Sequence, residues 1–372
     1  MSLAALSMAS PAEAQTAGYD SGFFIQSEDK LYKLKIEARM QARYTFASID
    51  EGLSRSEESA FSIPRARLKL SGHAFTKDLT YAFQSDFGRG FVSLKDVYID
   101  YRLVKDALHL RVGQWKRPFS RQQITSSGNL EFVDRALTDR AFRAGRDIGI
   151  AIQNNYEKSP PFEWALGLFN GTGETPTFTG AVAVDPATGE GSVSRGSFTN
   201  VPTVFHPTWV ARVGFNRGPV KGYSEADLEG GPLRLSVGAS GLVDLDADDD
   251  DVSAIRSEID FMLKTRGFSL SGAGYAATTQ DGSSFGDQTF AAVGAHAQAG
   301  YVIGEHAQPA LRYAVVRDAT ASTTTHEPLA AFNVYFYNHK LKWQTDGGPI
   351  ITQRPGSNTV DARVRTQLQL AF

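Results

Sequence analysis

The segment from Arg111 to Gly149 holds the residues whose types and spacing point most directly to chemistry. Cationic side chains outnumber carboxylates in it: Lys116, Arg117, Arg121, Arg135, Arg140, Arg143 and Arg146 stand against Glu131, Asp134, Asp139 and Asp147. Arginine stays charged at physiological pH, and its planar fork of N–H donors matches the oxygens of phosphate-like anions. The chemistry that this predicts is reversible anion binding, which needs no catalytic group.

Motifs for other kinds of chemistry do not occur. The chain has no cysteine, which excludes disulfides and thiolate metal sites. Its seven histidines are scattered without ligand spacing, and neither H-E-x-x-H nor G-x-S-x-G is present. We therefore expect no catalytic residue, no metal and no cofactor. A net charge of -3 does not favour a nucleic-acid partner.

The elements that must position the basic segment are strands. From Tyr32 to Phe46 apolar and polar residues alternate without a break, which is the period of a β-strand. A run of about fifteen residues exceeds the five or six of a typical strand and is long enough to cross a bilayer at a tilt. The polar face is heavily charged, as the wall of a water-filled lumen would be: Lys33, Lys35, Glu37, Arg39, Gln41 and Arg43.

Sixteen segments of this kind are expected, and no apolar run is long enough for a transmembrane helix. They lie at 31–47, 61–75, 78–87, 91–103, 107–116, 147–157, 162–170, 207–217, 232–243, 253–266, 267–279, 289–302, 308–317, 327–338, 339–346 and 360–372. An even number suits a closed antiparallel transmembrane β-barrel, which leaves no edge unpaired in lipid. The patterns at 289–302 and 339–346 are the weakest, so fourteen or eighteen strands are the alternatives.

The connections between these segments differ in length by parity. Every second one tends to be long and polar, at 48–60, 117–146, 171–206, 244–252 and 319–326, and most others are tight. Long external loops and short periplasmic turns produce this asymmetry, although 218–231 departs from it. A loop as long as 117–146 is usually functional. We expect this third external loop to fold into the lumen as a positively charged constriction.

Both ends of the chain suggest export to an outer membrane. Residues 1–14 read as the remnant of a secretory signal with an A-x-A cleavage site, and a disordered Ala-rich tail is the alternative. Residues 15–372 would then form a single barrel domain. The final V-R-T-Q-L-Q-L-A-F resembles the C-terminal strand signature read by the outer-membrane barrel assembly machinery.

Four stretches around the basic segment resemble the phosphate-selective porin family, of the porin O and P type. They are Gly113 to Phe119 (G-Q-W-K-R-P-F), Thr125 to Ser127, Leu130 to Leu137 (L-E-F-V-D-R-A-L) and Gly145 to Gly149 (G-R-D-I-G). The similarity begins near Phe61 and thins to a pattern after Gly149. The resemblance implies a homotrimeric, sixteen-stranded channel in the Gram-negative outer membrane, surrounded by lipid and lipopolysaccharide, whose third external loop narrows the pore.

The resemblance also implies positions for an anion site. It puts Arg65, Asp86 and Arg111 around the central site and Ser126 and Ser127 in the constriction loop. Phosphate-specific members have a lysine directly after the T-S-S triplet and another a few residues before it, where this chain has Gly128 and Gln123. The full predicted pore-lining set is Arg39, Arg43, Arg65, Arg67, Asp86, Arg111, Lys116, Arg117, Arg121, Ser126 and Ser127.

The leading hypothesis is a passive, anion-preferring porin for phosphate or related oxyanions, and no enzyme. A weakly selective porin is the alternative within the class, favoured by the missing lysines. In that case many arginines pair with carboxylates on neighbouring strands, among them Glu37, Asp96, Asp100, Glu258, Asp260 and Asp361. A barrel enzyme would need a nucleophile near the membrane rim. A soluble periplasmic β-protein is disfavoured, because so many apolar strand faces would leave a large exposed patch.

Overall fold

The computed structural model describes residues 15–245, 253–281 and 288–372, and the predicted signal remnant at 1–14 lies outside them. The strands are β1 Thr16–Tyr19, β2 Phe23–Gln26, β3 Lys33–Asp50, β4 Arg55–His73, β5 Leu79–Asp86, β6 Ser93–Val104, β7 Leu108–Lys116, β8 Arg146–Gln153, β9 Phe162–Phe169, β10 Thr177–Val184, β11 Gly191–Thr199, β12 Thr208–Arg217, β13 Arg234–Asp244, β14 Ser253–Thr265, β15 Phe268–Asp281, β16 Gln288–Tyr301, β17 Ala307–Asp318, β18 Thr323–Tyr337, β19 Leu341–Arg354 and β20 Ser357–Ala371. The helices are short: α1 Arg121–Ile124, α2 Leu137–Phe142, and the 3-10 turns η1 Gly88–Gly90 and η2 Tyr156–Lys158.

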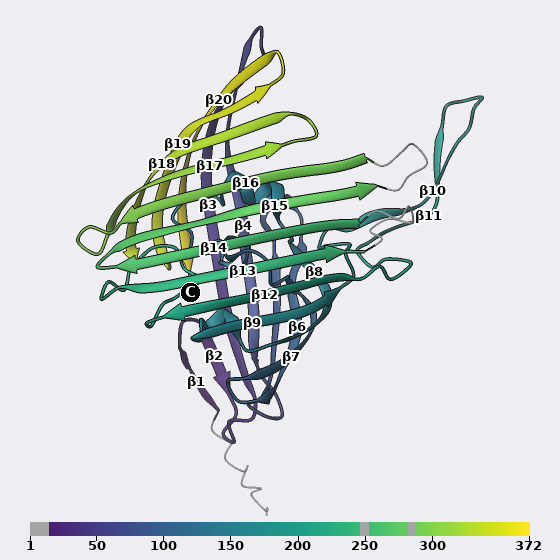
Figure 1. Cartoon of the computed structure of the whole chain (residues 1–372). Coiled ribbons are helices and arrows are strands. Elements are labelled where there is room, and N and C mark those ends of the chain that lie inside the picture. The colour runs from purple at the N-terminus through teal and green to yellow at the C-terminus, as the bar shows by residue number, and fades with distance from the viewer. Residues whose placement is uncertain (1–14, 246–252, 282–287) are drawn as a thin grey trace, which may run out of the picture.

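These strands close into one antiparallel barrel (Figure 1). Of the 18 strands in the sheet, β1 and β2 span four residues each, and the remaining sixteen form the ring. The ring closes where β20 pairs with β3, from Ala362 opposite Ser48 to Ala371 opposite Arg39. The predicted fold class and the count of sixteen are therefore confirmed. A separate hairpin, β10–β11, projects from the barrel in Figure 1.

Burial along each strand is the reverse of that in a water-soluble protein. On β12, Arg212 is 1% exposed while its neighbours Val213 and Phe215 are 50% and 57% exposed. Alternation therefore places polar side chains inside and apolar side chains outside, as a lipid environment requires. Among the described residues no helix is long and apolar enough to cross a membrane.

Three of the predicted polar loops contain stretches of strand that the prediction did not include; one is 319–326, where β18 begins at Thr323 opposite Asp318. The span 48–60 is the end of one hairpin, because β3 continues to Asp50, β4 begins at Arg55, and the pairing stays in register with Ser48 opposite Glu57. The span 171–206 contains the β10–β11 hairpin. Strands that leave the membrane have water on both faces, so they lose the apolar alternation on which the prediction depended.

The predicted strand at 339–346 is too short. β19 extends to Arg354, through a stretch that begins Gly347-Gly348-Pro349 and interrupts the apolar pattern. The ladder with β20 nevertheless continues, with Gly347 opposite Val364 and Pro349 opposite Ala362. Pairing with a long neighbouring strand holds this segment extended where its own residues favour a turn.

One glycine fixes the geometry of β7, the strand that leads into the basic segment. Gly113 lies opposite Tyr98 and has a φ of 130°, in the region that favours glycine. A Cβ atom there would lie 2.2 Å from the carbonyl oxygen of Val97. Close strand approach at this point therefore requires a residue without a side chain.

Gly113→Ala should destabilise the barrel, because a side chain in this conformation costs on the order of 1–3 kcal/mol before the clash is counted. The measurement is the temperature at which the folded band converts to the unfolded band on a denaturing gel. Gly241→Ala is the matched control, since a Cβ atom on Gly241 meets nothing within 4 Å. Equal conversion temperatures for the two variants would contradict the assigned role of Gly113.

Candidate anion-binding site

The inner faces of β3 and β4 bring four of the predicted arginines together. Arg39 lies opposite Arg67, and Gln41 lies opposite Arg65, with Arg43 two positions further along β3. Gln41 is completely buried while the intervening Met40 is 58% exposed, so the odd-numbered side chains of this stretch face inward. Period two on two neighbouring strands is thus enough to form a cluster of cations on one wall.

The connection between β7 and β8, residues 117–145, is bonded to strands all round the ring. Its Ser126 accepts a hydrogen bond from Arg39 on β3, and its Ser120 hydroxyl lies 2.9 Å from the Tyr275 hydroxyl on β15. The backbone N–H of Val133 donates to Asp346 on β19 at 2.9 Å. Three of its aromatic side chains are at most 1% exposed: Phe119, Phe132 and Phe142.

Arg39 and the T-S-S triplet form the centre of the candidate site. The Arg39 guanidinium donates to the hydroxyl oxygens of Ser126, at 2.8 Å, and Ser127, at 3.1 Å. In the described part of the chain no carboxylate oxygen lies within 4.0 Å of it. A Cβ atom on Gly128 would lie 2.5 Å from Arg39 Nη1. The Arg39 side chain therefore occupies the space that any side chain at position 128 would need.

Lys116, like Arg39, has no carboxylate partner within 4.0 Å among the described residues. Its ammonium donates to the backbone carbonyl oxygens of Ile124, at 2.9 Å, and Thr125, at 3.1 Å. Carbonyl groups satisfy its protons without neutralising its charge. Lys116, at the end of β7, thus places its ammonium at the C-terminal end of α1, where the T-S-S triplet begins.

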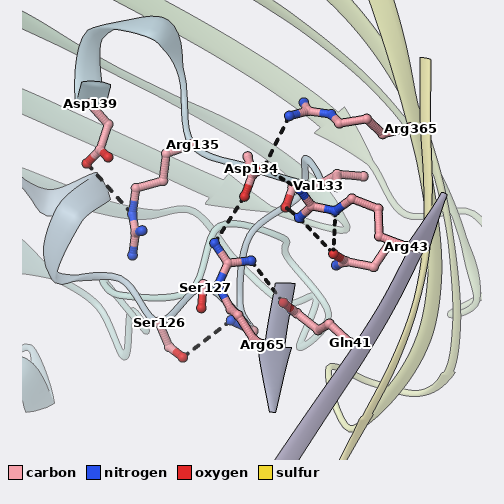
Figure 2. A network of polar contacts seen from close by, with 12 residues as sticks. Gln41, Arg43, Arg65, Ser126, Ser127, Val133, Asp134, Arg135, Asp139 and Arg365 are labelled. Atoms are coloured by element: carbon pink, nitrogen blue, oxygen red, sulfur yellow. Dashed lines mark hydrogen bonds and ion pairs between the residues drawn. The ribbon is translucent and has the colours of Figure 1, made fainter. Parts of the chain in front are cut away.

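A separate cluster is centred on Asp134 (Figure 2). Its carboxylate accepts from Arg43 at 2.7 Å, Arg65 at 3.0 Å and Arg365 at 3.2 Å. Burial acts to raise the pKa of Asp134, but the three guanidinium groups outweigh it and hold that pKa well below its usual range. Since Arg365 also pairs with Asp346 at 2.8 Å, the cluster holds three positive and two negative charges.

The remaining predicted residues have carboxylate partners. Arg67 donates to Asp86 at 2.7 Å, and Arg111 donates to Asp100 at 2.8 Å while its guanidinium stacks on Tyr98. Such pairs are those of the alternative interpretation, in which arginines are bound by carboxylates of neighbouring strands. Other pairs of this kind are Lys69 with Glu37, Arg146 with Asp96, and Arg212 with Glu258 and Asp260. Asp361 accepts from the backbone N–H of Asp50 instead.

Arg117 and Arg121 point to other parts of the barrel. Arg117 donates to the carbonyl oxygen of Ala144 at 2.7 Å and lies 3.4 Å from Asp147. Arg121 pairs with Asp260 on β14 and donates to the carbonyl oxygen of Gly222. Both side chains anchor the 117–145 connection to its surroundings.

A cavity of about 490 Å³ lies against the inner faces of β3 to β7. Of the predicted residues, Arg39, Arg67, Arg111, Lys116 and Ser126 line it, and Arg43, Arg65, Asp86, Arg117, Arg121 and Ser127 do not. Seven cationic side chains line the cavity: Arg39, Arg67, Lys69, Arg111, Lys116, Arg146 and Lys340. Among the described residues, the carboxylates that line the cavity are those of Glu37, Asp96 and Glu157, together with the C-terminal residue Phe372. In the described residues no cluster of histidines or carboxylates could hold a metal ion.

Sequence reasoning missed several contributors to this cavity. Lys340 and His339 come from the turn between β18 and β19, and Tyr223 comes from the connection between β12 and β13. No motif marks these residues, because a turn at the barrel end brings them into the cavity from far along the chain. Asp134 was visible as one acidic residue in a basic stretch, but its three arginine partners were not.

Comparison with known proteins agrees with this architecture. The model of the family described as phosphate-selective porin O and P matches residues 34–305 of the 372. No curated protein matches the chain at a significant level.

Several solved barrels share the fold. The outer membrane channel DcaP of Acinetobacter baumannii has a TM-score of 0.63 at 12% identity, and the match covers 93% of this chain and 99% of that one. An anion-selective porin from Comamonas acidovorans has a TM-score of 0.58 at 11% identity, with coverage of 91% and 99%. OmpT of Vibrio cholerae, in its trimer form, has a TM-score of 0.55 at 7% identity, with coverage of 90% and 99%.

At these identities the solved structures show a common fold and nothing finer. The family model, however, spans well over half of the chain and includes the basic segment. With a closed barrel that is polar inside and apolar outside, it identifies an outer-membrane channel. This chain belongs to the phosphate-selective porin O and P family.

Proposed function

We propose that this outer-membrane porin is a passive channel that prefers anions and passes phosphate or related oxyanions. Residues 117–145 cross the lumen as its constriction, within a single barrel domain of residues 15–372. Their bonds to β3, β15 and β19, which are far apart on the ring, support this placement. A segment held to so many strands leaves a narrow passage beside it.

The observation that carries the proposal is the excess of positive charge around the 490 Å³ cavity. Arg39, Lys116 and the exposed Lys340 have no carboxylate partner within 4.0 Å in the described part of the chain, and the first two are the partly buried ones beside the T-S-S triplet. At 4 Å, a unit charge attracts an anion by about 1 kcal/mol in bulk water and about 4 kcal/mol at an effective dielectric constant of about 20. A partly dehydrated anion is therefore stabilised here, while a cation is repelled.

The groups around Arg39 favour an oxyanion over a simple halide. The guanidinium fork, the Ser126 hydroxyl and the Lys116 ammonium offer N–H and O–H donors on one side of the cavity. Arg39 lies where a lysine at position 128 would project, so it supplies a cation at that place from β3. This exchange compensates for the lysine that the family pattern has after the T-S-S triplet.

A weakly selective porin is the second candidate. The ion pairs of Arg67 with Asp86 and of Arg111 with Asp100 favour it, because paired guanidinium groups present little net charge to a permeating ion. The two candidates differ in whether Arg39 and Lys116 dominate the field in the passage.

The assembly of the porin forms part of the same proposal. We expect a homotrimer surrounded by lipid and lipopolysaccharide, inserted by the barrel assembly machinery through β20, after removal of residues 1–14 as a signal. The trimer form of the OmpT barrel supports the oligomeric state by analogy of fold. Chemical cross-linking in the membrane should yield a species three times the mass of the monomer, and a monomer alone would contradict it.

Three predictions test the ion selectivity of the proposed channel, and the first concerns the sign of that selectivity. Purified porin in a planar bilayer across a potassium chloride gradient should give an anion-selective zero-current potential. Arg39→Gln combined with Lys116→Met should move that potential toward zero, because the two partly buried cations beside the T-S-S triplet that have no carboxylate partner are lost. Lys105→Gln, in the exposed turn between β6 and β7, is the control and should leave it unchanged. A zero-current potential of the wild-type porin that is zero, or that indicates cation selectivity, would contradict the proposed function.

The second prediction separates an oxyanion site from a general positive field. Arg39→Lys keeps the charge but replaces the planar fork with a point charge. Phosphate should block chloride current through the wild-type channel, and the variant should need several-fold more phosphate for the same block while its zero-current potential stays close to wild type. Identical phosphate titrations would show that the fork takes no part in recognition.

The third prediction concerns Asp134. Asp134→Asn removes one negative charge from between Arg43, Arg65 and Arg365, so anion selectivity should increase. Asp106→Asn, in an exposed turn, is the control of equal charge change. Because the pKa of Asp134 is depressed, the carboxylate loses its charge only well below its ordinary pKa, and this cluster should not alter selectivity between about pH 4 and pH 8. A shift near pH 4 to 5 that disappears in the variant would contradict this.

A further inference from the structure

The connection between β12 and β13, residues 218–233, is much longer than the other connections at its end of the barrel. The other connections at this end are short, at 74–78, 105–107, 154–161, 266–267, 302–306 and 338–340. A turn of two or three residues suffices to join antiparallel neighbours such as β12 and β13. The additional length therefore serves another purpose, which neither the barrel fold nor the proposed anion site explains.

This connection is buried, although a long polar connection outside the membrane would ordinarily be exposed. Five of its residues are at most 7% exposed: Val220, Ser224, Glu225, Ala226 and Asp227. Its far end is fixed by Asp227, which pairs with Arg234 and accepts the backbone N–H of Gly267 at 2.9 Å.

The middle of the connection reaches across the barrel mouth. Tyr223 donates to Glu163 on β9 at 2.6 Å, beside the strand from which the connection starts. The hydroxyl of the next residue, Ser224, lies 3.1 Å from Nε2 of His339, in the turn between β18 and β19. That turn is several strands away around the ring, so the connection extends over the interior.

Glu225 joins this connection to the basic segment. Its carboxylate accepts the backbone N–H of Glu131 at 2.8 Å and the side-chain amide of Gln122 at 3.3 Å. Its own backbone N–H donates to the carbonyl oxygen of Asn129 at 3.0 Å. Nearby, Arg121 donates to the carbonyl oxygen of Gly222 at 2.8 Å. These four bonds lie on both sides of Ser126, Ser127 and Gly128 in sequence.

We propose that residues 218–233 form a second segment folded into the barrel, which supports the constriction from the end of the barrel where this connection lies. Glu225 is the positioning residue that joins the two segments. The inference rests on the proposed function only in taking 117–145 as the constriction. Arg121 bonds to Asp260 on β14 and Tyr223 bonds to Glu163 on β9, so the joined segments are anchored on that side of the ring, while the cavity lies against β3 to β7.

The bonds of Glu225 define what its loss would do. Without its carboxylate, the buried N–H of Glu131 and the buried amide of Gln122 lose their acceptor, and residues 122–131 lose their support from this side. The constriction would then fluctuate, whereas the strand ladders of the barrel would stay intact. Glu229 is a matched control, because this exposed carboxylate of the same connection pairs, among the described residues, with Lys221 at the surface.

The first test measures whether the connection is folded inside. Since the chain has no cysteine, single substitutions give proteins with one thiol each. In porin that has passed the heat-modifiability test, a maleimide should label the E229C variant rapidly and the A226C variant slowly. V220C, at another buried position, replaces A226C if the latter does not fold. Equal labelling at the buried and exposed positions would overturn the inference.

The second test measures the constriction by single-channel conductance in symmetrical potassium chloride. Glu225→Ala should raise the conductance, on the order of 1.5-fold, with more frequent fluctuations. Glu225→Gln keeps an acceptor for the N–H of Glu131, so its conductance should equal that of the wild type. The control Glu229→Ala should also leave the conductance unchanged. Conductance of Glu225→Ala equal to that of Glu229→Ala would refute the positioning role. Conductance in symmetrical salt does not depend on which ion the channel prefers. The result can therefore be interpreted even if the channel is not anion-selective.

Discussion

The rest of the structure depends on the requirement that every backbone N–H and C=O group in lipid find a partner within the protein. An open sheet fails at its two edges, so the pairing of β20 with β3 is what makes the other strands viable in a membrane. Once the ring is closed, alternation along each strand puts one face in lipid and the other inside. The interior must then be built from the polar face, which is why arginines, lysines and carboxylates are among the most buried side chains of the molecule.

A polar interior has a cost, because each charge that leaves water must be compensated. On the wall formed by β12 to β14, charged side chains are compensated by ion pairs. Arg212 lies 2.9 Å from Asp260 and within 4 Å of Glu163 and Glu258. Such networks hold side chains rigidly and carry little net charge. Near β3 and β7 the compensation is incomplete. The function proposed for the porin arises from this difference between two parts of one wall.

Arg39 and Lys116, which have no carboxylate partner within 4.0 Å in the described part of the chain, are held by hydroxyl and carbonyl oxygens that carry no opposing full charge. Arg39 is oriented by Ser126 and Ser127, and Lys116 by the carbonyl groups of Ile124 and Thr125. Their positions therefore depend on the 117–145 connection, which is hydrogen-bonded to barrel strands and to residues 218–233. The rigid ring supplies the charges, and two irregular segments decide where they act.

The sequence by itself determined the strands that cross the membrane, because period-two alternation is a local property that survives without knowledge of partners. It also determined the family, through motifs confined to about forty residues between Gly113 and Gly149. Residues such as Arg39 and Lys116 were assigned to the interior for the same local reason. Outside the bilayer, β10, β11 and the ends of β3 and β4 carry no such alternation and were not recognised as strands.

Only the tertiary structure decided which of the interior cations lie beside a carboxylate. Asp134 meets Arg365 across 231 positions of the chain, and Glu225 meets Glu131 across 94. Closure of the ring brings such residues together, and no pattern along the chain records which strand will lie opposite which loop. The same holds for Gly128, whose missing side chain makes room for Arg39. Charge on the inner wall follows from alternation, whereas its neutralisation depends on long-range pairing in the folded barrel.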